Sequence, residues 1–181
     1  MQADNNQFDL HPVTIAAMTL IFGGPLVLLL ITGQPLVLAM AVYVNMTALS
    51  FYDFREYRLP NLLTGSFFLL ATGISYVFGP YAMQHHVIGA VLGAGLPLLL
   101  NTVYRHWRGR DGIGMGDIKL LAGAGMLLAW PALPLILSIS STLGIGYILL
   151  RHGPNRVKAG VTYIPFGPFI AFATITLWLF N

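Results

Sequence analysis

Long apolar runs, separated by short polar or turn-forming breaks, fill almost the whole chain. A helix needs about 20 apolar residues to cross the hydrocarbon core of a bilayer. The pattern therefore predicts seven membrane-spanning helices, at residues 13–31, 35–52, 62–78, 86–104, 118–130, 133–150 and 162–180. The breaks contain residues that favour turns, as at Gly33-Gln34-Pro35, Pro60-Asn61, Gly79-Pro80 and Gly153-Pro154.

The fifth run is the weakest of the seven. It reaches only from residue 118 to Trp130, directly before Pro131, which is enough for roughly 20 Å of helix. Two interpretations stay open for residues 118–150: two separate spans, or one long broken helix that would leave six spans in all.

Composition supports a membrane protein. Only 8% of the 181 residues are charged and 56% are hydrophobic, whereas a soluble domain carries about 25% charged residues. We predict an all-α, polytopic membrane helical bundle that forms a single domain. Cysteine is absent, which excludes disulfide bonds, cysteine-based zinc sites and a thiol nucleophile.

The basic residues indicate an orientation in the membrane. With seven spans, all nine Lys and Arg residues lie on one side, and the positive-inside rule makes that side cytoplasmic. The N-terminus is then inside and the C-terminus outside. We interpret the basic residues as topology signals and lipid contacts, because nucleic-acid binding needs a continuous basic face. They form three clusters: Arg55 and Arg58; Arg105, Arg108, Arg110 and Lys119; and Arg151, Arg156 and Lys158.

Two aspartates stand at the ends of apolar runs. Asp53 closes the second run and Asp117 opens the fifth, so the predicted topology puts both at the cytoplasmic interface. An ionisable residue at such a depth is a candidate functional residue. The alternative is that each aspartate pairs with a neighbouring cation, Asp53 with Arg55 or Arg58 and Asp117 with Lys119.

Two neighbouring carboxylates have a definite chemistry. They cannot both ionise easily, so they share one proton. The ionised carboxylate then activates a water molecule, and the protonated one polarises a peptide carbonyl. This hydrolysis needs no cofactor and no metal, and the adjacent pair His85-His86 has no third ligand near it in sequence. Gly112, Gly114 and Gly116 permit positive φ and close approach of a substrate backbone, or simply form a flexible loop.

Three motifs resemble those of a known family. "GMGDIKLLAGAG" at 114–125 resembles the Gly-x-Gly-Asp-x-Lys-Leu signature of the type IV prepilin peptidases, which are GxGD-type membrane aspartic proteases. "YDFREYRLPNLLT" at 52–64 resembles their other aspartate motif, and "IPFGPFIAF" at 164–172 is similar to their C-terminal Pro-Phe-Gly-Pro segment. The resemblance implies a catalytic core at 35–181, an extra N-terminal span at 13–34 and a polar cytoplasmic segment at 1–12.

The resemblance also implies an activity. Such enzymes are aspartic endopeptidases of the prokaryotic inner membrane, and they remove the basic leader from type IV prepilins or pseudopilins at the cytoplasmic face. Matched by residue, the catalytic pair is Asp53 and Asp117, while Gly114, Gly116 and Lys119 correspond to the positions around the second aspartate. The expected partners are a prepilin substrate and membrane lipid.

Two further acids and one departure from the family complete the prediction. Glu56 and Asp111 are candidate contacts for the basic leader, although pairing with Arg55, Arg58 or Arg110 is the alternative. Larger members carry paired Cys-x-x-Cys motifs that bind zinc. This chain resembles a short form without that domain, and nothing in it matches a nucleotide-binding loop, so we expect no methyltransferase activity.

Two other functions use the same aspartates. A small transporter or channel would bind protons or cations at Asp53 and Asp117, although transporters usually place such groups near the bilayer midplane. A presenilin-like protease would share the catalytic pair but cleave within transmembrane helices.

Overall fold

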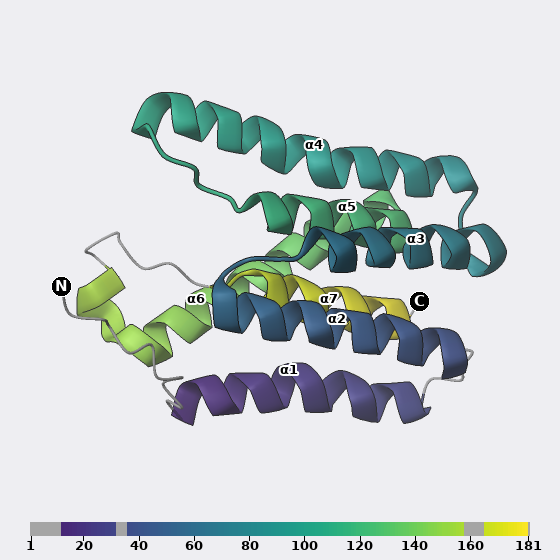
Figure 1. Cartoon of the computed structure of the whole chain (residues 1–181), viewed down its shortest axis with the longest axis horizontal. Coiled ribbons are helices and arrows are strands. Elements are labelled where there is room, and N and C mark those ends of the chain that lie inside the picture. The colour runs from purple at the N-terminus through teal and green to yellow at the C-terminus, as the bar shows by residue number, and fades with distance from the viewer. Residues whose placement is uncertain (1–11, 32–35, 158–164, 181) are drawn as a thin grey trace.

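The computed structural model describes residues 12–31, 36–157 and 165–180. These residues form helices and no strand, which confirms the predicted all-α membrane bundle (Figure 1). The elements are α1 Pro12–Ile31, α2 Leu36–Glu56, α3 Asn61–Phe78, α4 Met83–Arg108, α5 Met115–Leu128, η1 Trp130–Ala132, α6 Leu133–Val157 and α7 Gly167–Leu179.

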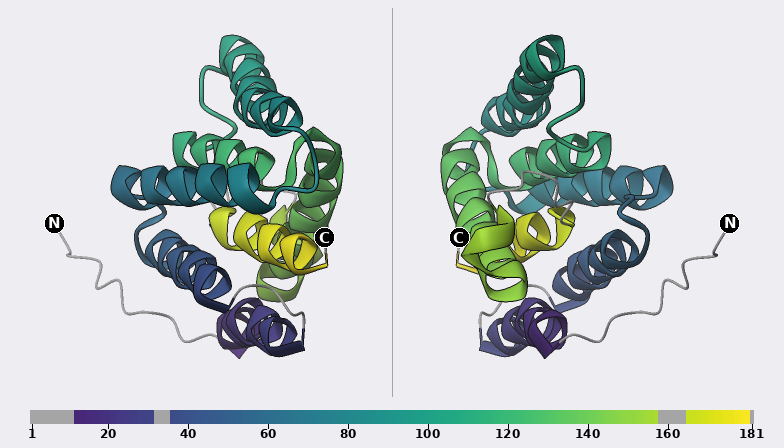
Figure 2. Two further views of the ribbon diagram at one scale, coloured as in Figure 1. Left: turned by 90° about the vertical axis from the view of Figure 1, so that its right-hand side faces the viewer. Right: turned by 90° about the vertical axis from the view of Figure 1, so that its left-hand side faces the viewer.

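Helices α5 and α7 form the interior of the bundle. α5 packs against α3, α4 and α7, while α7 also contacts α1, α2 and α6. The end-on views show α7 enclosed by its neighbours and α4 at the edge of the bundle opposite α1 (Figure 2). Most residues from Ile118 to Leu128 are buried, so α5 is lined by protein on nearly every side.

Among the described residues, four helical stretches are long and apolar enough to cross a membrane: α2, α3, α4 and Trp130–Leu150. α5 and α7 contain 14 and 13 residues, which gives each a length of roughly 20 Å. Each of the seven α-helices overlaps one of the seven predicted spans. α6 continues to Val157, past the Gly153-Pro154 break, while its membrane-spanning stretch ends at Leu150, as predicted.

The stretch 118–150 is two helices rather than one broken helix. α5 ends at Leu128 because Ala129 adopts a left-handed φ of 64°. The carbonyl of Met126, which has no partner inside the helix, accepts a hydrogen bond from Ser75 Oγ at 2.6 Å and lies 2.9 Å from His86 Nδ1. His86 therefore binds a helix end, and the adjacent His85 accepts a hydrogen bond from Trp130 Nε1 at 3.1 Å.

Small residues allow α4 and α5 to pack backbone against backbone. A Cβ atom added to Gly89 would collide with the carbonyl of Gly125, and one added to Gly125 would collide with the carbonyl of Gly89. Gly93 lies equally close to the carbonyl of Leu121. Such small-residue contacts are typical of membrane helices, and they hold α5 along the middle of α4.

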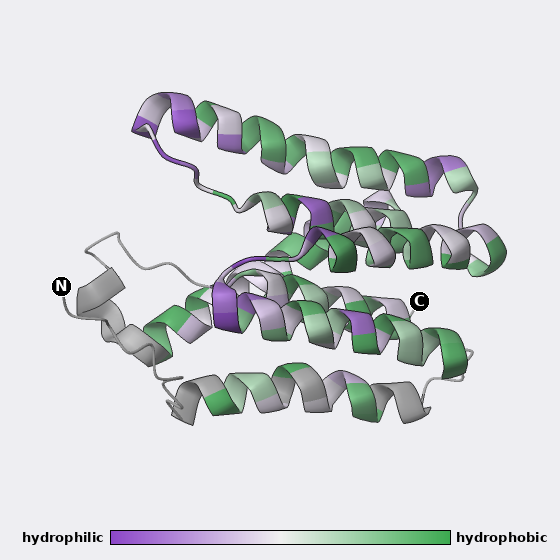
Figure 3. Cartoon of the chain, viewed as in Figure 1, coloured by the Kyte–Doolittle hydropathy of each residue, from purple (hydrophilic) through white to green (hydrophobic). Residues whose placement is uncertain are grey.

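One end of the bundle gathers the polar connections. The ends of α2 and α4 and the beginning of α7 lie on the left in Figure 1, and the connections to α3 and α5 run from that side to helix starts nearer the middle. Hydrophilic residues are concentrated there, at the end of α4, in the 109–114 loop and around the α2–α3 turn (Figure 3). The first two basic clusters therefore lie at one end of the bundle. Residues 1–11, Lys158 and the side chains of Arg151 and Arg156 lie outside the described part.

Candidate active site

Asp53 is buried near the end of α2 and is held by the first residue of α7. Its side chain is only 6% exposed, and its Oδ2 accepts a hydrogen bond from the Gly167 N–H at 2.9 Å. The first N–H groups of a helix have no partner inside the helix, so the carboxylate satisfies one of them. A Cβ atom at position 167 would lie 2.8 Å from Asp53 Oδ2. Glycine therefore gives the carboxylate the room that it occupies.

The backbone around Asp53 is fixed by the turn that ends α2. Tyr57 adopts a left-handed φ of 52°, and its N–H donates to the carbonyl of Asp53 at 3.0 Å. Arg55 and Arg58 are exposed, and neither forms an ion pair with Asp53 in the part of the chain that the structure describes. The alternative that these arginines neutralise Asp53 is therefore wrong.

Asp117 lies in the first turn of α5 and is half-buried. Its carboxylate packs against Gly114, where a Cβ atom would approach Oδ2 to 3.1 Å. Lys119, its expected alternative partner, instead donates from Nζ to Asn61 Oδ1 at 2.6 Å. Asn61 belongs to the Leu-Pro-Asn segment of the first aspartate motif, so Lys119 ties the two motifs together.

Leu59 links the two aspartates spatially. A Cβ atom on Gly116 would lie 2.7 Å from Leu59 Cβ, and one on Gly167 would lie 3.4 Å from Leu59 Cδ1. The first turns of α5 and α7 therefore contact the same side chain. The first turn of α5 carries Asp117, and that of α7 provides the amide that binds Asp53. Leu59 therefore lies between the two helix turns that hold the aspartates.

The glycines before Asp117 act through their missing side chains. Gly114 has an ordinary φ of −65°, and among the described glycines the one with positive φ is Gly109, at 68°. Glycine permits a positive φ, but Gly112, Gly114 and Gly116 do not adopt one. Gly112 instead packs against the Tyr104 ring and Gly116 against Leu59, and the approach of a substrate backbone stays a prediction.

The two remaining candidate acids differ in their surroundings. Asp111 Oδ1 lies 3.8 Å from Arg105 Nη1 and accepts a hydrogen bond from Asn101 Nδ2 at 3.3 Å. Asp111 therefore has Arg105 as an ion-pair partner. Glu56 is exposed at the end of α2 and forms no ion pair within the described ranges.

Two groups around the site were not predicted from the sequence: the Gly167 N–H and the Asn101 side chain. The Gly167 amide is a backbone group, and only its place in the Pro-Phe-Gly-Pro segment marked it. Asn101 is a single amide in the apolar run "LPLLLNTVY". An amide in such a run could have been predicted to have a specific hydrogen-bond partner. It is buried, with 5% exposure, and it binds the loop that precedes Asp117.

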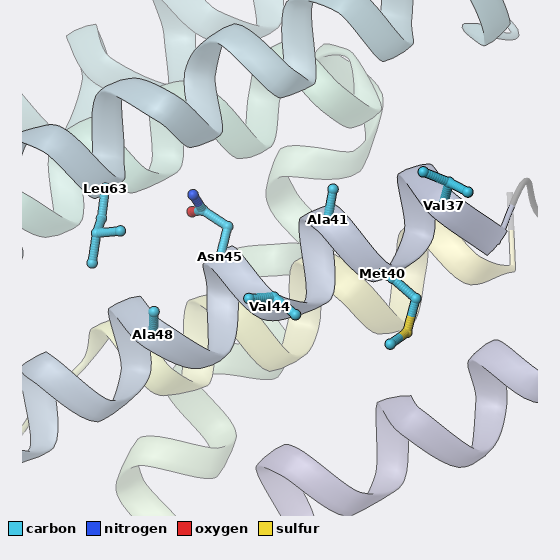
Figure 4. A pocket seen from close by; sticks show the side chains of 7 residues that line it. All are labelled: Val37, Met40, Ala41, Val44, Asn45, Ala48 and Leu63. Carbon is cyan, nitrogen blue, oxygen red and sulfur yellow. The ribbon is translucent and has the colours of Figure 1, made fainter.

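A groove of about 420 Å³ lies between α2 and α3, away from both aspartates (Figure 4). Its lining is apolar except for Asn45, whose Nδ2 donates to Ser66 Oγ at 2.7 Å. The groove offers no acid, base or nucleophile, so it is not a candidate active site. Its lining residues are Val37, Met40, Ala41, Val44, Asn45, Ala48 and Leu63.

The chain matches one protein family model and several known relatives. The sequence model of the type IV leader peptidase family matches residues 40–149, a range that contains both Asp53 and Asp117. A prepilin leader peptidase/N-methyltransferase of Aeromonas salmonicida (strain A449) is 37% identical over 166 residues, which is 88% of this chain and 51% of the relative. The protein of the same name from Escherichia coli (strain K12) is 36% identical over 129 residues, 70% of this chain and 56% of the relative.

A shorter relative is covered almost completely. The leader peptidase HopD of Escherichia coli is 29% identical over 136 residues, which is 73% of this chain and 86% of that protein. The chain spans about half the length of the prepilin leader peptidase/N-methyltransferases that it matches. No solved structure matches it.

Proposed function

Because the chain belongs to the type IV leader peptidase family, we propose that it is a membrane-embedded aspartic endopeptidase that removes the basic leader from prepilins or pseudopilins. The observation that carries this proposal is geometric: the first turn of α5, which carries Asp117, and the first turn of α7, whose Gly167 N–H binds Asp53, contact the same Leu59 side chain. Both aspartates lie at helix ends near polar loops, whereas cation transporters usually bind their ions near the midplane. Hydrolysis at the interface therefore fits the site better than transport.

The reaction follows from two carboxylates that share a proton. The ionised carboxylate takes a proton from water as the water oxygen attacks the scissile carbonyl carbon, and the protonated carboxyl donates to the carbonyl oxygen. The tetrahedral intermediate then collapses, the C–N bond breaks, and the departing amine takes up a proton. The Gly167 N–H keeps the Asp53 carboxylate in place at 2.9 Å, so its orientation is fixed before substrate arrives.

The polar end of the bundle faces the cytoplasm of a prokaryotic cell in this proposal. Arg55, Arg58 and Arg108 lie at that end, and the positive-inside rule supports this orientation. The N-terminus is then inside and the C-terminus outside. A basic leader is drawn to the anionic inner surface of the membrane, while the apolar helix that follows it stays in lipid. The scissile bond then lies at the depth of the aspartates.

Roles in substrate binding are proposed for five residues around the pair. Gly114 is exposed beside Asp117 and has no side chain that would block an extended substrate backbone. Gly116 and Lys119 position the surrounding turn, Gly116 against Leu59 and Lys119 through Asn61. Glu56 is exposed and offers a free carboxylate to the basic leader. Asp111 offers its second oxygen, since the described bonds use Oδ1. The peptidase core comprises 35–181, preceded by an extra span at 13–34.

The direct test is cleavage of a purified prepilin by the purified protein in lipid, with mass spectrometry to identify both products. We expect one cut that separates the basic leader from the apolar helix. A matched prepilin, whose leader Lys and Arg residues are replaced by Gln, should be cut more slowly because it loses its attraction to the site. Absence of cleavage of several prepilins by folded protein would refute the proposed function.

A further inference from the structure

We propose that Asn101 of α4 is a positioning residue for the active site, acting through the backbone of the loop that precedes Asp117. This inference rests on the proposed function, because it assigns Asn101 a part in the same reaction. Asn101 belongs to none of the three motifs. Its part is to hold the loop, and the first turn of α5, in the place that the aspartate pair requires.

Every polar atom of the Asn101 side chain is used on one loop. Its Oδ1 accepts hydrogen bonds from the Gly112 N–H at 2.7 Å and from the Ile113 N–H at 3.0 Å. Its Nδ2 donates to Asp111 Oδ1 at 3.3 Å. Burying an amide in an apolar environment is unfavourable unless it is hydrogen-bonded, and here all three bonds go to three consecutive residues.

The position of Asn101 along α4 explains why a clamp is needed there. α4 runs on to Arg108, about two turns and roughly 10 Å beyond Asn101. The chain therefore has to fold back along the end of α4 before α5 begins, as Figure 1 shows. Gly109 makes the reversal with a φ of 68°, and Gly112 packs against the ring of Tyr104. Asn101 fixes the returning chain at the level where α5 starts.

The clamp is one step away from Asp117. Gly114 follows the two bonded amides directly, and its carbonyl accepts the hydrogen bond of the Ile118 N–H at 3.2 Å, within the first turn of α5. Asp117 lies in that turn, with its carboxylate against Gly114. Fixing residues 112 and 113 thus fixes the start of the helix that carries Asp117.

Loss of the clamp should act locally rather than on the whole fold. Gly112 is exposed and Ile113 only half-buried, so water can replace Asn101 as the partner of their N–H groups. The packing of α5 against α3, α4 and α7 does not depend on the loop. An enzyme without the clamp should therefore fold normally and hold Asp117 less accurately, and a misplacement of about 1 Å can reduce a rate 100-fold.

The experiment compares three proteins: Asn101→Ala, the double variant Asn101→Asp/Asp111→Asn, and Asn45→Ala as a matched control on α2. The double variant restores the hydrogen bonds of the clamp, because the new carboxylate accepts from both loop N–H groups and the new amide donates to that carboxylate. We expect Asn101→Ala to lower kcat on prepilin about 10- to 100-fold and to speed hydrogen exchange in 109–114 alone. The double variant Asn101→Asp/Asp111→Asn should restore slow hydrogen exchange in 109–114, whereas its kcat and KM also report any contact of Asp111 with the leader. Asn45→Ala should leave kcat and loop exchange unchanged.

Each outcome decides the proposal. The proposal would be overturned if Asn101→Ala showed the same hydrogen-exchange rates in 109–114 as the unmodified protein. It would also be overturned if this variant kept the unmodified kcat. If the folded double variant did not restore slow hydrogen exchange in 109–114, Asn101 would act in another way. If the unmodified protein cleaves no prepilin, the proposed function fails. The hydrogen-exchange rates of residues 109–114 still decide whether Asn101 clamps the loop.

Discussion

Replacing Gly167 with Ala tests how the active site holds Asp53. The added Cβ atom would lie 2.8 Å from Asp53 Oδ2, 3.3 Å from its Cγ and 3.4 Å from Leu59 Cδ1. The first of these distances is about 0.6 Å short of ordinary contact, which begins near 3.4 Å. Asp53 is buried, so its carboxylate has little room to retreat without lengthening the 2.9 Å hydrogen bond to the Gly167 N–H.

The expected effect is on the rate more than on the fold. A displaced carboxylate activates water less well, and a shift of this size should lower kcat about 10- to 100-fold, equivalent to roughly 1.4–2.8 kcal/mol. Steady-state cleavage of prepilin measures kcat and KM, and thermal unfolding measures stability in the same detergent.

Gly146→Ala in α6 is the matched control, because nothing lies within 4 Å of its added Cβ atom. It should leave kcat unchanged and keep or slightly raise the melting temperature, as Gly→Ala does in a helix. Wild-type kcat in Gly167→Ala would refute the reasoning, since it would show that the position of the Asp53 carboxylate is unimportant. A loss of kcat in Gly146→Ala as large as that in Gly167→Ala would refute it too.

Three other predictions follow from the described bonds. Lys119→Met and Asn61→Ala should each lower kcat a few-fold, and the double variant should be no slower than either, because each substitution removes the same 2.6 Å hydrogen bond. A double variant whose loss of kcat equals the product of the two single losses would contradict this. Ser75→Ala should lower stability by about 1 kcal/mol without changing kcat, because it removes a bond to Met126 at the far end of α5; thermal unfolding with a kinetic assay checks both parts, and an altered kcat would contradict it. The cleavage rate should pass through a maximum as pH rises. At low pH both aspartates are protonated and no base remains, while at high pH both are ionised and no acid remains. A rate that stays constant at high pH would exclude the shared proton.

The sequence predicted the placement of the two aspartates because that depends on span order. Asp53 closes one apolar run and Asp117 opens another, and an intervening pair of spans returns the chain to the same end. The sequence also explains why neighbouring cations do not pair with the two aspartates, because their spacing along the helix is unfavourable. Arg55 and Lys119 each lie two residues after an aspartate, and residues at that spacing do not face each other on a helix.

Other features depend on contacts between distant segments. The Gly167 N–H reaches Asp53 across 114 residues, and no local pattern specifies such a bond. The division of 118–150 into two helices depends on Ala129 and on bonds from Ser75 and His86 to Met126. Hydropathy alone left that choice open because the whole stretch is apolar. The place of Asn101 was visible as a polar residue among leucines, but its target was not.

The most direct test of the central claim measures kcat for Asp53→Asn, Asp117→Asn and the double variant, with Asp9→Asn as the control aspartate outside both motifs. If the two carboxylates act as one unit, each single variant should lose at least about 1,000-fold and the double variant should be no slower than either, because residues that act as a unit show strongly non-additive effects. Asp9→Asn should cleave at the unmodified rate. A folded Asp53→Asn or Asp117→Asn variant that still cuts prepilin at the unmodified rate would contradict the account.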